Sequence, residues 1–193
     1  MAGGRKLSFN KEASLEKAML LFWEKGYAAA SLSELTDSMG INKPSMYSTF
    51  GNKEELFVQA TDYYINKHAK QHIAHLQGNG SAAQKLEQYM VSIVTAQSSA
   101  ALPKGCYISL SVSESAGGAI PESAAKKVEY ARGLTHEVLT EFFMTHGTES
   151  EYSTNEKALF IESILHGTAA MARGDVRLDE LKIVVSQAIK AVF

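Results

Sequence analysis

The chain has 193 residues, of which 45% are hydrophobic and 21% are charged, and its formal net charge is −2. These values are close to globular averages and argue against disorder, collagen-like sequence and membrane spans. No apolar run approaches the roughly 18 residues of a spanning helix, and residues 1–10 lack the apolar core of a signal peptide, so we expect a soluble cytoplasmic protein.

Charge is distributed unevenly along the chain. Residues 1–53 contain seven Lys or Arg and five acidic residues, a net charge of +2, whereas the remainder contains twelve and sixteen, a net charge of −4. A nucleic-acid partner calls for a basic surface, and only the N-terminal part provides one. The single cysteine, Cys106, excludes an intramolecular disulfide and fits a reducing compartment.

Apolar residues recur at spacings of three and four, and the chain has only three prolines, which predicts an all-α fold of about nine helices. Helix starts are marked by capping boxes, such as Ser31 with Glu34, and Gly26 and Gly40 mark helix ends. The segment 103–114 is the least certain, because it combines Gly105 with several serines. The other expected helices span about 10–25, 31–40, 42–51, 52–76, 81–101, 121–146, 153–173 and 176–193.

The second and third helices are separated only by Gly40 and Ile41, which indicates a helix-turn-helix. The third helix is about 12 Å long, a length that suits the major groove of DNA. Met46 and Phe50 are expected to face the core. An ordinary corner between two helices with a solvated polar face remains the alternative. The side chains expected to face outward are Lys43, Ser45, Ser48 and Thr49, with Tyr47 between the two faces.

Residues 26–57 resemble the N-terminal signature of TetR-family transcriptional regulators. The resemblance rests on Gly26-Tyr27, on the run 31–35 (SLSEL) and on the run 40–57 (GINKPSMYSTFGNKEELF), in order and at the family's spacing. It implies DNA contacts from the recognition helix and phosphate contacts from its flanks, through Ser31, Asn42, Lys43, Pro44, Ser45, Tyr47, Ser48, Thr49 and Lys53. The sequence departs from the family at Thr49, where histidine is common, and at Pro44, where glycine is frequent.

The resemblance also implies two regions, a DNA-binding domain at 1–53 and a ligand-binding and dimerisation domain at 54–193. A single recognition helix makes few contacts, so a homodimer on a palindromic operator is expected. The expected dimer surface consists of Ile161, Ile164, Leu165, Thr168, Met171, Leu181, Val185 and Ala188. The alternative is that these apolar stripes pack inside one subunit.

The C-terminal region of TetR-like proteins holds a small-molecule effector. Candidate pocket residues here are Tyr64, Tyr89, Ile93, Cys106, Leu110 and Phe142, although such stripes can also be plain core. The function expected is therefore a repressor that releases its operator when a small molecule binds. An alternative is a redox- or electrophile-sensing repressor acting through Cys106, whose place at a helix start near Lys104 favours the thiolate. A small buried hydrophobe is the other interpretation of that cysteine.

His68, His72 and His75 fall on one helix face, and the first pair has the spacing of zinc ligands. Because the sequence identifies no acid or thiolate beside them, solvated histidines and no metal or cofactor are expected. The chain has no phosphate loop, nucleophile elbow or carboxylate pair that would indicate an enzyme. A helical interaction module that does not bind DNA is the third alternative.

Overall fold

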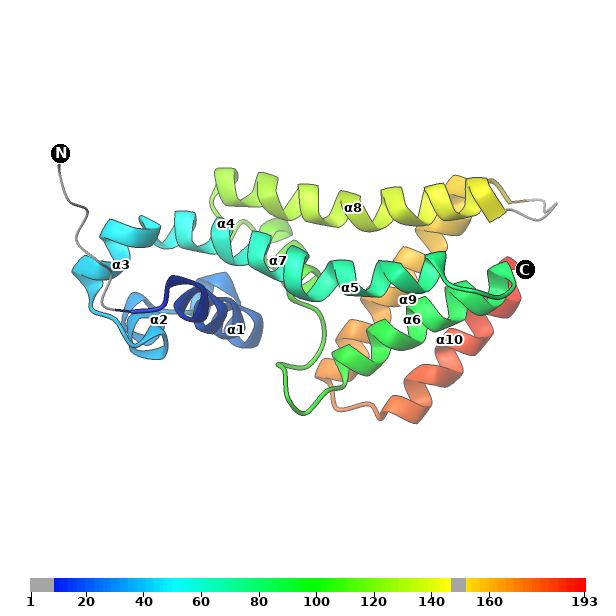
Figure 1. Ribbon diagram of the computed structural model, residues 1–193, viewed down its shortest axis with the longest axis horizontal. Coiled ribbons are helices and arrows are strands. Elements are labelled where there is room, and N and C mark those ends of the chain that lie inside the picture. The colour runs from blue at the N-terminus through cyan, green and yellow to red at the C-terminus, as the bar shows by residue number, and fades with distance from the viewer. Residues whose placement is uncertain (1–8, 147–151) are drawn as a thin grey trace.

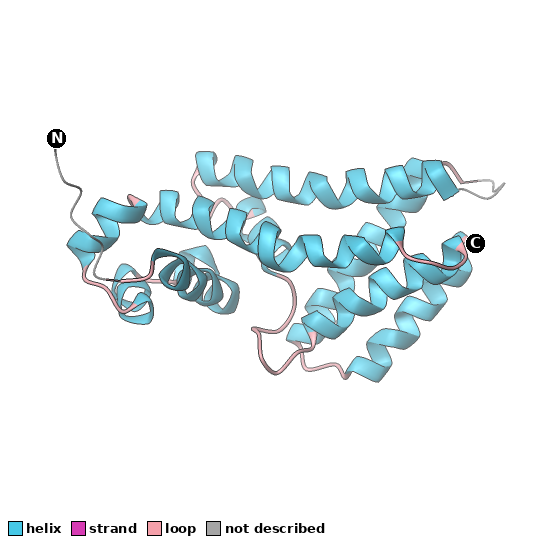
Figure 2. Cartoon of the chain, viewed as in Figure 1, coloured by secondary structure: helices cyan, strands magenta, loops and turns pink. Residues whose placement is uncertain are grey.

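The computed structural model describes residues 9–146 and 152–193, and every regular element in those two ranges is helical (Figures 1 and 2). The all-α prediction is therefore confirmed. Arg5 and Lys6, which contribute to the predicted basic N-terminal part, lie outside the described residues. No described helix is long and apolar enough to cross a membrane.

Three helices form a unit at the N-terminal end, the left side of Figure 1: α1 (Lys11–Ala29), α2 (Leu32–Met39) and α3 (Lys43–Phe50). The expected end of the first helix at Gly26 is a break within α1, where Gly26 has φ 84° and the chain then resumes a helical turn. The predicted capping box of Ser31 and Glu34 is present at the start of α2. We call these three helices the head.

The expected long fourth helix is interrupted. It consists of α4 (Lys53–Tyr64), a π-helical turn η1 (Ile65–Ala69), α5 (Lys70–Ile73) and a 3₁₀ turn η2 (Ala74–Gln77). Single π-helical turns insert a residue into a helix and often occur at functional sites. Together the four elements form a nearly continuous rod that leads away from the head in Figure 1.

The remaining helices are α6 (Ala82–Gln97), α7 (Tyr107–Ala116), α8 (Glu122–His146), α9 (Thr154–Arg173) and α10 (Leu178–Val192). Of these, α6 ends four residues before the predicted limit at Ala101, and the uncertain segment 103–114 is helical from Tyr107. The long helix α8 lies along one side of the molecule, while α9 and α10 lie at the end opposite the head (Figure 1).

Two hydrophobic cores hold these helices together. The first joins the head to α4, α7 and the N-terminal half of α8, through side chains such as Phe22, Phe57 and Tyr107. The second joins η2, α6, the C-terminal half of α8, α9 and α10, around Leu86, Phe143 and other apolar residues. Because the first core continues past residue 53, the head does not have a core separate from α4 and α7.

Candidate nucleic-acid interface and internal cavity

The sharp turn between α2 and α3 depends on Gly40, which has the left-handed conformation (φ 69°, ψ 32°) that glycine adopts without strain. Asn42 then caps α3, since its side-chain oxygen accepts a hydrogen bond from the backbone N–H of Ser45 at 2.8 Å. Met46 and Phe50 are buried in the first core, as predicted. These contacts fix the orientation of α3 within the head.

The outer side of α3 is polar and accessible. Asn42, Lys43, Pro44, Tyr47 and Ser48 are exposed, with 49% of Tyr47 accessible, whereas Ser45 and Thr49 are only partly so. The Ser48 hydroxyl donates to the carbonyl of Ser45 at 3.1 Å and keeps its lone pairs toward solvent. The face predicted to contact DNA is thus presented at one end of the molecule.

The two flanking positions, Ser31 and Lys53, already have partners within the subunit. The Ser31 hydroxyl donates to Glu34 at 2.7 Å, and the Lys53 ammonium lies 4.5 Å from the centre of the Tyr27 ring. The Glu34 carboxylate accepts from Lys25 and Ser31, and these bonds lower its pKa to about 2. Phosphate contacts at Ser31 and Lys53 therefore stay predictions, and the negative charge of Glu34 lies beside one of them.

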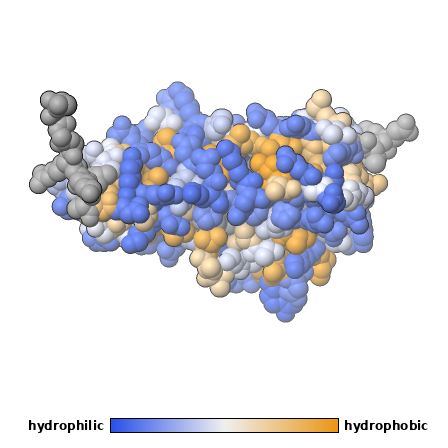
Figure 3. All heavy atoms as spheres, in the orientation of Figure 1, coloured by the Kyte–Doolittle hydropathy of each residue, from blue (hydrophilic) through white to orange (hydrophobic). Residues whose placement is uncertain are grey.

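A cavity of about 170 Å³ lies where the two cores meet. Its wall combines Trp23 of the head with residues of the rod, α6, α7, α8 and α9. Hydrophobic side chains gather over α5 and α8 on the face seen in Figure 3, and partly exposed apolar residues from that region line the cavity, among them Ala69, Ile73, Leu134 and Val138. The cavity therefore lies between the rod and α8 and is partly open to solvent.

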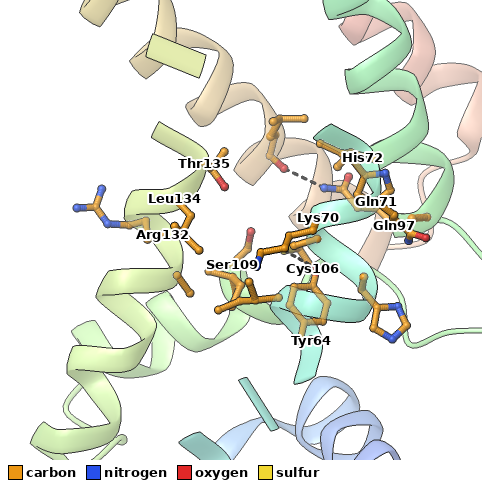
Figure 4. A pocket seen from close by; sticks show the side chains of 18 of the residues that line it. Tyr64, Lys70, Gln71, His72, Gln97, Cys106, Ser109, Arg132, Leu134 and Thr135 are labelled. Atoms are coloured by element: carbon orange, nitrogen blue, oxygen red, sulfur yellow. Dashed lines mark hydrogen bonds between the residues drawn. The ribbon is translucent and has the colours of Figure 1, made fainter. Parts of the chain in front are cut away.

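Four of the six candidate pocket residues, Tyr64, Tyr89, Ile93 and Cys106, line this cavity; Tyr64 and Cys106 are labelled in Figure 4. The structure does not bring the other two to it. Leu110 directly follows the lining residue Ser109 in α7, about 100° further round the helix, and is not part of the cavity wall, while Phe142 packs in the second core against Phe143 and His146. Helical periodicity gave no means of distinguishing a core residue from a cavity wall.

Sequence reasoning missed a polar cluster at the wall formed by α8 and α9. Glu162 is almost fully buried, and its carboxylate lies 3.6 Å from Arg132, 3.2 Å from His136 and 3.8 Å from His166. His166 also shares a hydrogen bond of 2.8 Å with the Ser109 hydroxyl, which links α9 to α7. The signal available in the sequence was the spacing of Glu162 and His166, an acid and a histidine four residues apart in α9.

Cys106 is the N-cap residue of α7, as the predicted helix start required, and its side chain is half-buried. Its Sγ lies 3.4 Å from the Tyr64 hydroxyl. Lys104, expected to favour the thiolate, instead pairs with Asp175. Burial raises the pKa of the Tyr64 hydroxyl well above its usual value, so Tyr64 is a neutral partner for the sulfur.

The prediction that the histidines are solvated is wrong for two of the three. His68 packs against the rings of Trp23 and Tyr64, and His72 shares a hydrogen bond of 2.9 Å with Ser92 of α6. Burial lowers the pKa of His72 to about 4, so it is neutral at pH 7. Only His75 is exposed. The described ranges contain no group of three or more His, Cys, Asp or Glu side chains suited to a metal ion.

Most residues of the expected dimer surface are buried within the subunit, and this is a correction to the sequence analysis. The second core packs α9 and α10 against α6 and α8, so six of the predicted residues have no surface to offer a partner. Ile164 is half-buried and Met171 is 36% exposed. The six buried residues are Ile161, Leu165, Thr168, Leu181, Val185 and Ala188.

Met171 and three apolar side chains outside the predicted set are exposed on the outer sides of these two helices. Leu159, Phe160 and Met171 lie on α9 with Gly167 and Ala170 between them, and Ile183 of α10 is 62% exposed. Small residues between large apolar ones let two helices approach closely. We call this set the outer α9–α10 face.

Known proteins resemble this chain in sequence and in fold. Residues 15–60 match the model of a family described as "Bacterial regulatory proteins, tetR family". The chain is 29% identical to the HTH-type transcriptional repressor ComR of Escherichia coli over 185 residues, which cover 92% of this chain and 86% of that protein. It is 41% identical to the HTH-type transcriptional repressor BdcR of the same organism over 66 residues, 34% of each chain.

Solved structures extend the similarity to the whole chain. A cysteine mutant of the TetR family transcriptional regulator CifR, complexed with 26-base-pair operator DNA, matches with a TM-score of 0.86 and 28% identity, covering 97% of this chain and 99% of that one. The reduced form of Escherichia coli NemR matches with a TM-score of 0.79 over 92% of this chain, and at 17% identity it shows the fold alone.

Proposed function

The chain belongs to the tetR family of bacterial regulatory proteins, and from this premise we propose that it is a homodimeric repressor which releases a palindromic operator when a small molecule occupies the internal cavity. The observation that carries the proposal is the exposed polar side of α3, held by Met46 and Phe50 at the end of the molecule farthest from α10. A helix so placed can enter a major groove while the rest of the subunit stays clear of the duplex.

The experiment that tests this function is selection of bound sequences from a pool of random duplexes. We expect the full-length protein to enrich an inverted repeat whose half-sites are separated by about one helical turn or a multiple of it. Half-site spacing reports the distance between the two α3 helices of a dimer. Enrichment of no sequence, with no retention of duplex DNA at low salt, would support an interaction module instead.

We place the dimer contact on the outer α9–α10 face. Leu159, Phe160, Met171 and Ile183 are large apolar side chains that remain exposed in the single subunit, and such patches mark interaction surfaces. A second copy is the partner that twofold symmetry supplies, because the same patch on both subunits is self-complementary. In Figure 1 α9 and α10 lie away from α3, so a contact through this surface leaves both α3 helices accessible.

A route from the cavity to the head is provided by α7. Ile108 and Ser109, in its first turn, line the cavity, and Glu114, near its end, accepts hydrogen bonds from the backbone N–H groups of Tyr27 at 2.7 Å and Ala28 at 3.1 Å. Gly26 has φ 84°, a conformation that L side chains rarely adopt, and a Cβ atom there would lie 2.5 Å from the Glu114 carboxylate and displace it.

The other side of the same break in α1 is bound by α9. Arg173 donates to the carbonyl of Trp23 at 2.9 Å and to that of Glu24 at 3.3 Å. The helix break at Gly26 is thus capped from both sides by residues outside the head. Movement of α7 relative to α9 would change the position of α1, and with it that of α3.

Glu114→Gln tests this route. An amide can accept a hydrogen bond only at its oxygen, and its NH₂ group would face a second backbone donor, so we expect a loss of about 1–2 kcal/mol in stability. Amide exchange at Tyr27 and Ala28 should quicken roughly tenfold, and operator affinity should fall about three- to tenfold. Glu122→Gln is the control, because Glu122 is exposed and pairs with Lys126 within α8. Unchanged exchange at Tyr27 would refute the route.

A second candidate mechanism is supported by the position of Cys106. Its half-buried thiol lies on the cavity wall, where an electrophile entering the cavity would meet it. Because the chain has one cysteine, the product of alkylation is unambiguous. N-ethylmaleimide should release operator from the wild type and leave Cys106→Ser bound, as measured by fluorescence anisotropy. Equal release from both proteins would exclude sensing by this thiol.

A further inference from the structure

One side of α9 holds both the start of α7 and the break in α1. His166, Ala169 and Arg173 are spaced three and four residues apart, so they share a side of the helix. Arg173 donates to the backbone carbonyls of Trp23 and Glu24, beside the break, at 2.9 and 3.3 Å. The C-terminal end of this side of α9 is therefore bound to the head directly.

The start of α7 lies close against the same side of α9. At Gly105, two residues before α7, a Cβ atom would lie 2.8 Å from the backbone carbonyl oxygen of Ala169. In the first turn of α7, the Ser109 hydroxyl and Nδ1 of His166 share a hydrogen bond of 2.8 Å. The close backbone approach and the side-chain bond together hold the start of α7 against α9.

The surroundings of the His166 ring give this hydrogen bond a direction. Burial lowers the pKa of His166, so the ring is neutral at pH 7. Its Nε2 lies 3.8 Å from the Glu162 carboxylate, which only accepts, so Nε2 carries the proton and Nδ1 accepts from the Ser109 hydroxyl. Glu162 is itself held by Arg132 and His136 of α8. The polar cluster therefore fixes the ring that binds α7.

The helix α9 also carries the proposed dimer contact. Phe160 and Met171 are exposed on a different side of α9 from His166, because successive residues of a helix turn by about 100°. In a dimer joined through that side, α9 keeps a fixed position relative to the twofold axis. The contacts from α9 to α7 and α1 then determine where each head lies, and with it the distance between the two α3 helices.

We propose that Ser109 and His166 are a positioning pair, which sets the half-site spacing that the dimer recognises. Their bond joins α9 to α7, and α7 binds the break in α1 through Glu114. Both residues lie outside the head, so the pair acts on the spacing of the half-sites and not on their base sequence. This inference rests on the proposed function, because it requires a dimeric regulator on an inverted repeat.

The test compares the affinity of the full-length protein for the selected inverted repeat with its affinity for duplexes that have one base pair added or removed between the half-sites. Ser109→Ala and His166→Phe should each reduce the preference for the selected spacing about three- to fivefold, because each removes the bond between α7 and α9. The double variant should show the same reduction as either single variant, since all three lack one and the same interaction. Fluorescence anisotropy measures the affinities.

This preference separates positioning from a merely structural role. A general loss of stability would lower the affinity for all three duplexes by the same factor and leave the preference at its wild-type value, which would overturn the proposal. Additive reductions in the double variant would contradict action through the shared bond between Ser109 and His166.

Ser113→Ala is the matched control, because it removes another serine hydroxyl from the same helix. Ser113 is exposed, and its hydroxyl donates to the Ser109 carbonyl within α7 at 3.1 Å. This variant should keep the wild-type preference. Equal reductions from Ser113→Ala and Ser109→Ala would indicate a general effect on α7 and contradict the assignment of the pair.

The wild-type protein separates this proposal from the function on which it rests. If the wild type selects no inverted repeat, the proposed function is overturned and the positioning pair with it. If the wild type selects a repeat and both single variants share its spacing preference, the positioning pair alone is overturned.

Discussion

Lys43→Glu is expected to lower operator affinity roughly 100-fold at physiological salt. Lys43 is the first residue of α3 and is exposed, so its ammonium can reach a phosphate when α3 enters the groove. Each dimer carries the substitution twice and therefore exchanges two attractive charges for two repulsive ones. The measurement is a fluorescence anisotropy titration with a duplex recovered by selection.

The control for this substitution is Lys85→Glu, which makes the same charge change at the start of α6, near the end of the molecule opposite the head (Figure 1). It should alter affinity less than threefold, because contacts beyond a Debye length of about 8 Å are screened. Lys43 takes no part in the first core, so stability should be unchanged. Equal losses from the two variants would mean that net charge, and not α3, governs binding.

Ile183→Asp is expected to convert the dimer to a monomer and to reduce operator binding to the non-specific level. Ile183 is 62% exposed in the subunit, so an aspartate there leaves the fold intact but buries two uncompensated carboxylates in a symmetric interface. Loss of one half-site contact removes most of the affinity of a twofold complex. Size-exclusion chromatography with light scattering measures the mass, and anisotropy measures the DNA binding.

Tyr130→Asp is the matched control, because Tyr130 is a large side chain of α8 that is 56% exposed and lies near Lys127, which pairs with Asp62 of α4. It should remain dimeric. If Ile183→Asp stays dimeric and binds DNA normally, the subunits meet elsewhere than on the outer α9–α10 face.

Local signals in the sequence predicted the helices well, because caps act within one turn. The boxes of Ser31 with Glu34, Ser81 with Gln84 and Ser153 with Glu156 are all present in the structure. The break at Gly26 was also signalled, although the helical turn after it was not. That turn depends on Glu114, which is 87 residues away from Tyr27 along the chain.

Features that depend on distant packing were predicted less well. Apolar periodicity identifies a buried stripe but not what covers it, so Ile161 and Val185 were assigned to a partner when they belong to the subunit's own core. The π-helical turn that begins at Ile65 gives no local signal, and it changes which residues of the rod face the cavity. Apolar periodicity also fails to distinguish a core residue from a residue of a cavity wall, which is why Phe142 is predicted to line a pocket that it does not line.

The salt dependence of operator binding by the wild-type protein tests the central claim most directly. Because a dimer contacts phosphates through two heads, its operator affinity should fall steeply as the salt concentration rises. The slope of log affinity against log salt should be about −0.9 for each phosphate contact. Lys43→Ala should remove about two of these contacts per dimer and make the slope correspondingly shallower. The account predicts this pair of results on a selected inverted repeat. A shallow slope that Lys43→Ala leaves unchanged would contradict it.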